Sequence, residues 1–243
     1  MPLILNLDTS TQICSVAIAS EGKLLGSREN HEDKSHSRKL SIFIQELLSE
    51  HDLNTSGLDA IAVSKGPGSY TGLRIGVSTA KGIAYGSNIP LIGIDTLDAL
   101  VSGALQNQEI KNILERDGST LLCPMIDARR MEVYTALYAS SGKSIEEVSA
   151  RIIEETTYLE TLENKKIIFF GNGAAKCRSK INHSNAVFVD TIETSAINMV
   201  HLAEKLWKQK KFEDLAYFEP FYLKDFIATI PKNKIIPGEP PAT

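Results

Sequence analysis

The chain has 243 residues, of which 42% are hydrophobic and 23% charged, and its formal net charge is −4. A chain of this length can bury a hydrophobic core, as one large or two small domains. Its net negative charge argues against a protein that binds nucleic acid without a partner. No secretion signal precedes Asp8 and no apolar run approaches the ~20 residues of a membrane span, so we expect a cytoplasmic protein. The three cysteines, Cys14, Cys123 and Cys177, are too widely spaced for a zinc site and are interpreted as buried free thiols.

The first half of the sequence predicts apolar strands that alternate with amphipathic helices. In chain order, its predicted strands are Leu3–Asp8, Ile13–Ala19, a strand opened by the turn 19–23, Ala60–Val63 and 92–96. A helix over 35–51 carries an apolar stripe at helical spacing, and a second helix begins after the glycine-rich turn 66–68. Ser69 or Thr71 is its expected N-cap, and a third helix runs on from 92–96.

The second half repeats this order of elements. Its predicted elements are a strand over Leu121–Asp127, a strand over 132–138, the turn 139–143, a helix over 155–164, a strand over 166–170 with the turn 171–174, and a strand over 187–191 that runs into a helix. Each half therefore follows the plan β-β-β-α-β-α-β-α. A single unit with this order of elements is typical of ribonuclease H. Two such units in tandem are typical of the actin, Hsp70 and sugar-kinase superfamily. We expect an α/β fold of two ribonuclease-H-like domains, 1–107 and 108–228, and a flexible tail over 229–243.

The helix after the glycine-rich turn has one face that is almost free of side chains. Small residues recur on it every four positions, at Gly72, Gly76, Ala80 and Ala84. Such a stripe lets another backbone approach closely, and the neighbour is either the chain's own sheet or a helix of another subunit. Arg74 lies in the first turn, where the helix dipole favours anions, so it either meets a negative group or is simply solvated.

Nucleotides in the actin-like superfamily lie between two hairpin loops whose glycines let the backbone approach the phosphates. Neither corresponding loop here, 8–15 or 127–131, contains a glycine, and Arg129 and Arg130 occupy the second. The candidate nucleotide or anion residues are Asp8, Ser69, Arg74, Gly171 and Gly173. An autonomous ATPase or kinase is thus the weaker alternative. We expect no catalytic residue, metal or cofactor, since no nucleophile has a base partner and no histidine pair is spaced for a metal.

Charged residues also cluster around the second loop, at Asp127, Arg129, Arg130 and Glu132. They form either a solvated set of salt bridges or a fixed polar surface for a partner. Four longer motifs resemble those of the bacterial TsaB family, formerly called YeaZ, over residues 3–225: Leu5–Ser10, Lys65–Gly76, Ile126–Tyr134 and Glu219–Lys224. The last motif usually ends in Arg, and Lys224 keeps the charge while losing bidentate pairing.

The resemblance implies a non-catalytic subunit of the machinery that makes threonylcarbamoyladenosine in tRNA, without protease activity. TsaB-like proteins form a heterodimer with the catalytic subunit TsaD through their N-terminal domains, and the ATPase TsaE joins that complex. A homodimer through the same face is expected when the partner is absent, and little direct contact with tRNA is expected from the net charge. The predicted interface residues are His36, Lys39, Leu40, Phe43, Arg74, Val77, Ala80, Lys81 and Ala84.

Overall fold

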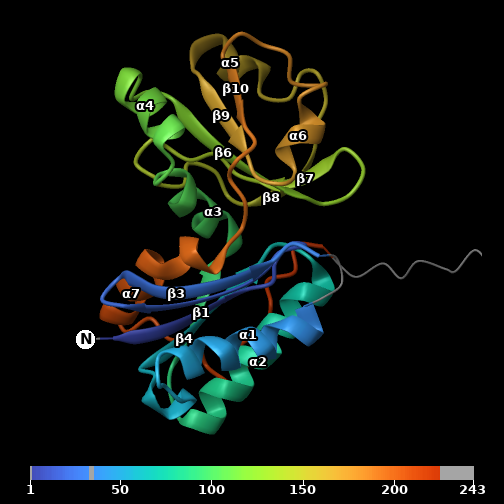
Figure 1. The fold of residues 1–243 in the computed structure, drawn as a ribbon. Coiled ribbons are helices and arrows are strands. Elements are labelled where there is room, and N and C mark those ends of the chain that lie inside the picture. Colours follow the sequence, from blue (N-terminus) through green and yellow to red (C-terminus); the bar gives the residue numbers. More distant parts are fainter. Residues whose placement is uncertain (1, 33–35, 225–243) are drawn as a thin grey trace, which may run out of the picture.

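The computed structural model describes residues 2–32 and 36–224, which form two lobes, each built on a five-stranded sheet (Figure 1). The first sheet consists of β1 (Leu3–Asp8), β2 (Cys14–Ser20), β3 (Lys23–Asn30), β4 (Ala60–Gly66) and β5 (Leu91–Asp95). The second consists of β6 (Leu121–Asp127), β7 (Glu132–Thr135), β8 (Ser149–Ile152), β9 (Ile167–Phe170) and β10 (Ala186–Val189).

The helices alternate with these strands as the duplication predicts. They are α1 (His36–Glu50), α2 (Tyr70–Ser87), α3 (Thr96–Ala104), α4 (Gln108–Arg116), α5 (Leu159–Asn164), α6 (Ala174–Cys177) and α7 (Val200–Lys208), with short 3-10 turns η1 (Thr55–Gly57) and η2 (Ala196–Met199). Of the helices within the described ranges, none has the length and apolar character needed to cross a membrane.

Both sheets have the same strand order, β3-β2-β1-β4-β5 in the first lobe and β8-β7-β6-β9-β10 in the second. In each, the first three strands are antiparallel and the last two run parallel to the first. This confirms the predicted tandem ribonuclease-H-like fold. The differences from the prediction lie mainly in the second half. There α4 is an additional amphipathic helix between the repeats, and β8 begins only at Ser149 instead of directly after the turn 139–143. The predicted strand 132–138 ends at Thr135, and the predicted helix 155–164 begins at Leu159.

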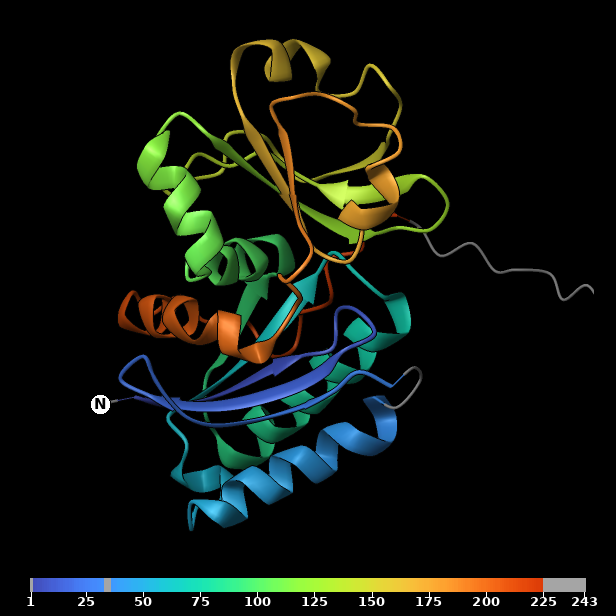
Figure 2. The same ribbon diagram turned by 45° about the horizontal axis from the view of Figure 1, so that its top comes forward.

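Each lobe contributes a helix that covers the other. In both views α1 and α2 lie side by side on one face of the first sheet, and α7 lies on the opposite face, toward the second lobe (Figures 1 and 2). Met199 and Ala203 at α7 pack in one apolar cluster with Ile4 and Ile92 of the first sheet. Conversely, Leu97 of α3, which follows the first sheet in the sequence, packs in the core of the second lobe. The boundaries 1–107 and 108–228 stay a prediction, and the predicted tail 229–243 lies outside the described residues.

The segment 213–224, here called the C-terminal strap, ties the two lobes together. The amide of Glu213 donates to Leu91 O at 2.9 Å at the edge of β5, and the amide of Phe221 donates to Lys65 O at 2.7 Å. At its end the strap reaches the second lobe, where Lys224 forms an ion pair with Glu132 of β7. The strap thus fixes the hairpin of the second lobe relative to the first.

Candidate functional site

The first predicted nucleotide loop, which follows β1, lies directly on the N-terminal turn of α2. The amide of Ser69, the N-cap of α2, donates to Ser10 O at 2.6 Å, and Thr9 Oγ1 donates to Gly72 O at 2.7 Å. A Cβ on Gly68 would lie 2.2 Å from Ser10 O, and one on Gly72 would lie 2.0 Å from Thr9 O. The glycines therefore serve a close contact between two backbone segments. The loop also uses the Ser69 amide, one of the groups with which a helix N-terminus binds phosphate.

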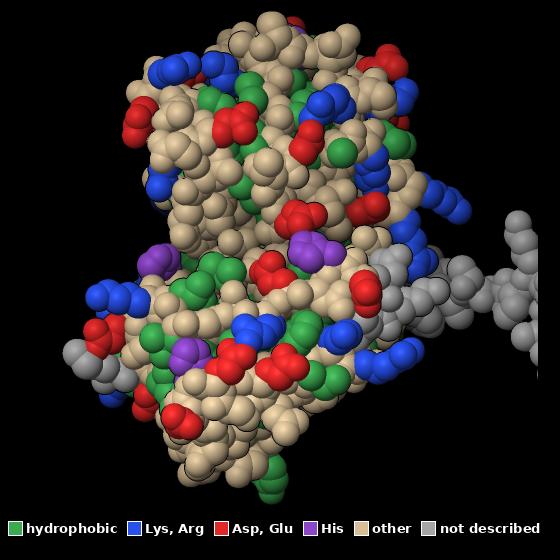
Figure 3. Space-filling view, viewed as in Figure 1, with side chains coloured by type: hydrophobic (Ala, Val, Ile, Leu, Met, Phe, Trp, Pro, Cys, Tyr) green, Lys and Arg blue, Asp and Glu red, His purple; other side chains and the backbone are tan. Residues whose placement is uncertain are grey.

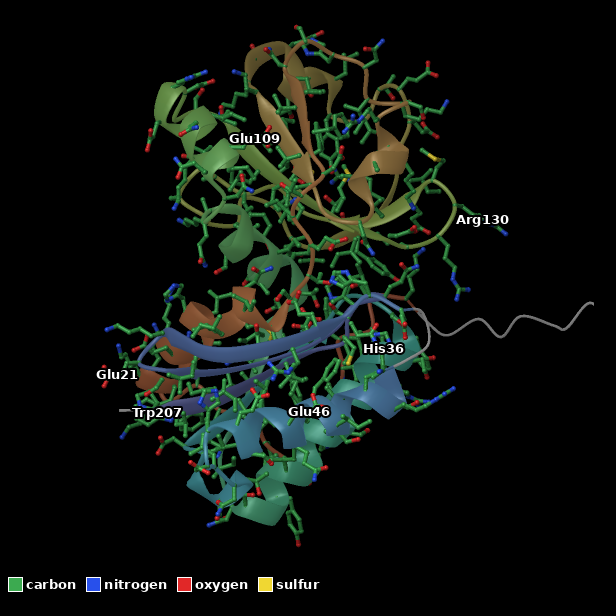
Figure 4. All side chains as sticks on the ribbon, viewed as in Figure 1. Glu21, His36, Glu46, Glu109, Arg130 and Trp207 are labelled. Atoms are coloured by element: carbon green, nitrogen blue, oxygen red, sulfur yellow. The ribbon has the colours of Figure 1, made fainter. Side chains whose placement is uncertain are left out.

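Asp8, the acid at the end of β1, is buried inside this same loop. Its Oδ1 accepts hydrogen bonds from the amide of Ser10 at 2.9 Å and from Ser10 Oγ at 2.6 Å, while its Oδ2 has no partner among the described residues. Burial raises the pKa of this carboxyl above its ordinary value, and the hydrogen bonds from Ser10 oppose that shift. His36, labelled in Figure 4 where α1 begins, fastens the helix to the loop by a contact of 2.9 Å between Nε2 and Thr11 O.

The second glycine turn, after β9, is also explained by close packing. Gly171 has a φ of +94°, and a Cβ there would lie 2.5 Å from Met125 O. The amide of Gly173 donates to the same Met125 O at 2.9 Å, and the amide of Asp127 donates to Asn172 Oδ1 at 3.0 Å. This turn thus packs on the end of β6. Binding of a nucleotide or anion at Gly171 or Gly173 stays a prediction, and the packing accounts for both glycines without it.

The stripe of small residues on α2 faces the chain's own sheet, which resolves the alternative left open by the sequence. A Cβ on Gly76 would lie 2.3 Å from Thr9 Oγ1, and Ala80 and Ala84 are fully buried in the core of the first lobe. Leu40 and Val77, which the sequence places at the interface, are buried in this same core. These side chains hold the first lobe together and are not available to a partner in this structure.

The opposite, outward side of α2 carries a second row of small residues that the sequence reasoning missed. A Cβ on Gly82 or Gly86 would meet no atom within 4 Å, so both positions are open to solvent. Beside them Tyr85 is 82% exposed, and on the neighbouring α1 Ile42 is 46% exposed. We call Gly82, Tyr85 and Gly86 the outer helical surface. The four-residue spacing of Gly82 and Gly86 was the available signal, but two stripes of equal spacing do not reveal which one faces the sheet.

The other predicted interface residues have separate roles. Lys81 Nζ donates to Phe218 O at 2.8 Å and so holds the C-terminal strap against α2. The guanidinium of Arg74 is exposed and lies 4.7 Å from the ring centroid of Tyr70. Lys39 is half-buried, and Phe43 packs partly on the core. Contact of these residues with a partner stays a prediction.

The three cysteines are buried, and the acidic and histidine side chains of the described residues do not cluster around a metal site. Cys14, Cys123 and Cys177 are free and buried, as predicted, and burial raises the pKa of the Cys14 and Cys177 thiols to about 11 and that of Cys123 to about 12. A thiolate nucleophile is therefore disfavoured at neutral pH. Within residues 2–32 and 36–224, no group of three or more His, Cys, Asp or Glu side chains is placed to hold a metal ion.

Comparison with known proteins places this arrangement in one family. The family model "TsaD: tRNA N6-adenosine threonylcarbamoyltransferase" matches residues 24–232. The chain is 30% identical to the tRNA threonylcarbamoyladenosine biosynthesis protein TsaB of Bacillus subtilis and 29% identical to that of Haemophilus influenzae, covering in each case 91% of this chain and 93% of the relative. Among solved structures it is similar to YeaZ from Pseudomonas aeruginosa, at 26% identity and a TM-score of 0.75, over 92% of this chain and 100% of that one. A further P. aeruginosa structure, described as an uncharacterized protein with similarity to peptidase YEAZ, has a TM-score of 0.76 at the same identity and coverage.

Proposed function

Because this chain belongs to the TsaB (YeaZ) family of tRNA threonylcarbamoyladenosine biosynthesis proteins, we propose that it is a non-catalytic subunit that binds and supports a TsaD-like catalytic subunit. The observation that carries the proposal is the outer helical surface, where two open glycine positions lie beside an exposed tyrosine. A row without side chains lets a partner helix approach closely, and the exposed Tyr85 supplies apolar area for it to cover.

The packing around the first loop supports an accessory role over an enzymatic one. The Ser69 amide bonds to the loop, and Asp8 is buried with its hydrogen bonds directed to its own loop. A phosphate or a hydrated metal ion would have to displace these contacts. This geometry therefore favours an accessory subunit over the alternative of an autonomous ATPase or kinase. The P. aeruginosa relative is described as similar to a peptidase, but the buried thiols of this chain do not support protease chemistry.

The family resemblance and the outer helical surface suggest further partners. A TsaE-like ATPase is proposed to join the heterodimer, and the chain alone is proposed to cover the outer helical surface by forming a homodimer, since an exposed apolar face tends to be covered. We assign the complex to the cytoplasm, where tRNA modification takes place.

The decisive experiment is size-exclusion chromatography with light scattering, on the chain alone and mixed with the TsaD-like subunit of the same genome. We expect a one-to-one complex and no ATP turnover by the isolated chain. Gly82→Leu should weaken the complex by about 5- to 150-fold, because overpacking a close contact typically costs ~1–3 kcal/mol. The substitution has open space in the isolated chain and replaces a helical glycine, so it should not destabilise the fold.

The matched control is Asn112→Leu, at an exposed position on α4. It adds the same apolar side chain to a helix outside the outer helical surface and should leave the affinity unchanged. Undiminished binding by Gly82→Leu would remove the interface from this surface. Absence of any complex, together with ATP turnover by the chain alone, would restore the enzymatic alternative.

A further inference from the structure

The hairpin between β6 and β7 presents two arginines on an unfavourable backbone. Arg129 has a φ of +71° and Arg130 a φ of +51°, a left-handed conformation that residues with a Cβ rarely adopt and that such turns usually give to Asn or Gly. The turn is closed by hydrogen bonds from the amide of Glu132 to Arg129 O at 3.1 Å and from the amide of Ala128 to Glu132 O at 3.1 Å. Figure 4 shows Arg130 at the tip of this hairpin, projecting away from the second lobe. Strain of this kind is a reason to look for a function of the side chains that it displays.

The acids of the same hairpin are neutralised by lysines and not by these arginines. Lys176 Nζ contacts Asp127 Oδ1 at 2.7 Å, and Lys224 pairs with Glu132. Both arginine side chains are exposed, and within the described ranges neither guanidinium takes part in an ion pair or a hydrogen bond. The salt bridges expected of this cluster are present, but they run to Lys176 and Lys224 and leave the two arginines unpaired. A polar surface for a partner stays a prediction.

The unused cations continue into a row of rings and cations that crosses from one lobe to the other. Lys224, at the end of the strap, lies 5.9 Å from the ring centroid of Tyr134. Two residues earlier, Tyr222 lies against Tyr70 with ring centroids 4.7 Å apart, and Arg74 covers Tyr70 at 4.7 Å.

We call this row the basic–aromatic strip; it comprises Arg74, Tyr70, Tyr222, Lys224, Arg129 and Arg130. Glu219 is an exposed acid on the same strap, so the strip is basic but not uniformly so. In Figure 3, Lys and Arg side chains project along the right-hand edge of the molecule, beside the hairpin of the second lobe.

We propose that the basic–aromatic strip binds the sugar–phosphate backbone of tRNA, an inference that rests on the proposed function. Guanidinium groups match phosphate in charge and geometry, and the guanidinium groups of Arg129 and Arg130 are exposed and make no ion pair or hydrogen bond within the described residues. An acidic protein surface would also match the arginines, and the experiment below distinguishes it from tRNA. The strip has no means of reading base edges across a groove, so the contact is independent of sequence. The net charge of −4 led us to expect little contact with tRNA, but a sum over the whole chain hides a basic region on one edge.

The test is a titration of the full chain, alone and mixed with the TsaD-like subunit, with a fluorescently labelled unmodified tRNA transcript. The variant is Arg129→Gln with Arg130→Gln, and the matched control is Lys111→Gln with Arg116→Gln, which removes two exposed cations from α4. Figure 1 shows α4 on the opposite side of the second lobe from the hairpin. We expect the hairpin variant to bind about tenfold more weakly and its salt dependence, between about 50 and 200 mM, to lose about two units of slope. The control should keep affinity and slope near those of the parent.

Parental affinity and slope in the hairpin variant would overturn the proposal, as would failure of the parent to bind tRNA in either setting. If the variant instead loses affinity for a protein partner while its tRNA affinity stays unchanged, the arginines face an acidic protein surface and the RNA assignment is wrong. The proposed function fails separately, by absence of the heterodimer in light scattering. In that case the titration of the isolated chain still decides whether the strip binds RNA.

Discussion

Two glycines on the same helix should respond to the same substitution with opposite signs. In Gly76→Ala the new Cβ would lie 2.3 Å from Thr9 Oγ1, far inside contact distance. That oxygen must move, although it donates to Gly72 O at 2.7 Å. Overpacking costs ~1–3 kcal/mol and the lost hydrogen bond about 1 kcal/mol, while the better helix propensity of alanine returns about 1 kcal/mol. We expect the free energy of unfolding to fall by about 1–3 kcal/mol.

Gly82→Ala is the internal control for this prediction. A Cβ there meets nothing within 4 Å of the same chain, so only the propensity term remains. At a concentration low enough for the chain to be monomeric, the variant should gain up to about 1 kcal/mol. Urea unfolding of the two variants and the parent, followed by circular dichroism and by fluorescence of Trp207, measures both changes under one set of conditions. The tryptophan lies on α7, which covers the opposite face of the same sheet from α2 (Figure 4).

Equal changes in the free energy of unfolding for Gly76→Ala and Gly82→Ala would contradict this prediction. If both stabilise, the contact between α2 and the first loop is looser than the structure shows. If both destabilise, Gly82 also faces a neighbour, and light scattering of the isolated variant would then test whether that neighbour is a second copy of the chain.

Three further substitutions probe the buried polar and small side chains. Ala80→Leu should lower the free energy of unfolding by ~1–3 kcal/mol in chemical denaturation, since Ala80 is fully buried; it therefore tests the core and not the partner interface. The pKa of Asp8 is raised in the fold above 3.8, its ordinary value, so the parent loses stability as pH rises above 3.8 and the buried carboxyl ionises. Asp8→Asn has no such charge and should therefore gain stability relative to the parent over this range. Thermal unfolding of both proteins at pH 4 and pH 8 measures the difference. Tyr138→Phe removes the hydrogen bond of 2.7 Å from Tyr138, in the segment after β7, to Asp98 of α3. It should cost about 0.5–1.5 kcal/mol in urea unfolding, with an unchanged far-ultraviolet dichroism spectrum as the check that the fold is kept.

The fold was largely readable from the sequence because its signals are local and occur twice. Leu3–Asp8 and Leu121–Asp127 are both predicted at their observed bounds, since an apolar run that ends in an acid has clear limits. Ser69, one of the two expected caps, is the observed N-cap of α2. By contrast, α4 was missed because its weak apolar content did not stand out between the repeats. The strap carries no periodic pattern from which its path could be predicted.

The candidate site was less readable because it depends on which side of an element faces inward. Gly76 and Gly82 belong to two rows with the same spacing, and only packing distinguishes them. The sequence identified the inward row as the interface, whereas the outward row is the one that is exposed. The role of Arg129 could not be predicted either. It has no ion pair because Lys176 and Lys224, which are distant in the sequence, pair with the two acids of its hairpin.

The covering of the first sheet by α7 has a consequence for the synthesis of this protein. When Asn107 has left the ribosome, every strand of the first sheet exists, but the face that includes Ile4 and Ile92 still lacks Ala203 and the rest of its cover. At roughly 5–20 residues per second, translation of the second repeat leaves that apolar face open for on the order of ten seconds. The nascent chain thus exposes an apolar strand face of the kind that chaperones recognise, and the first lobe is completed only when nearly the whole protein has been made.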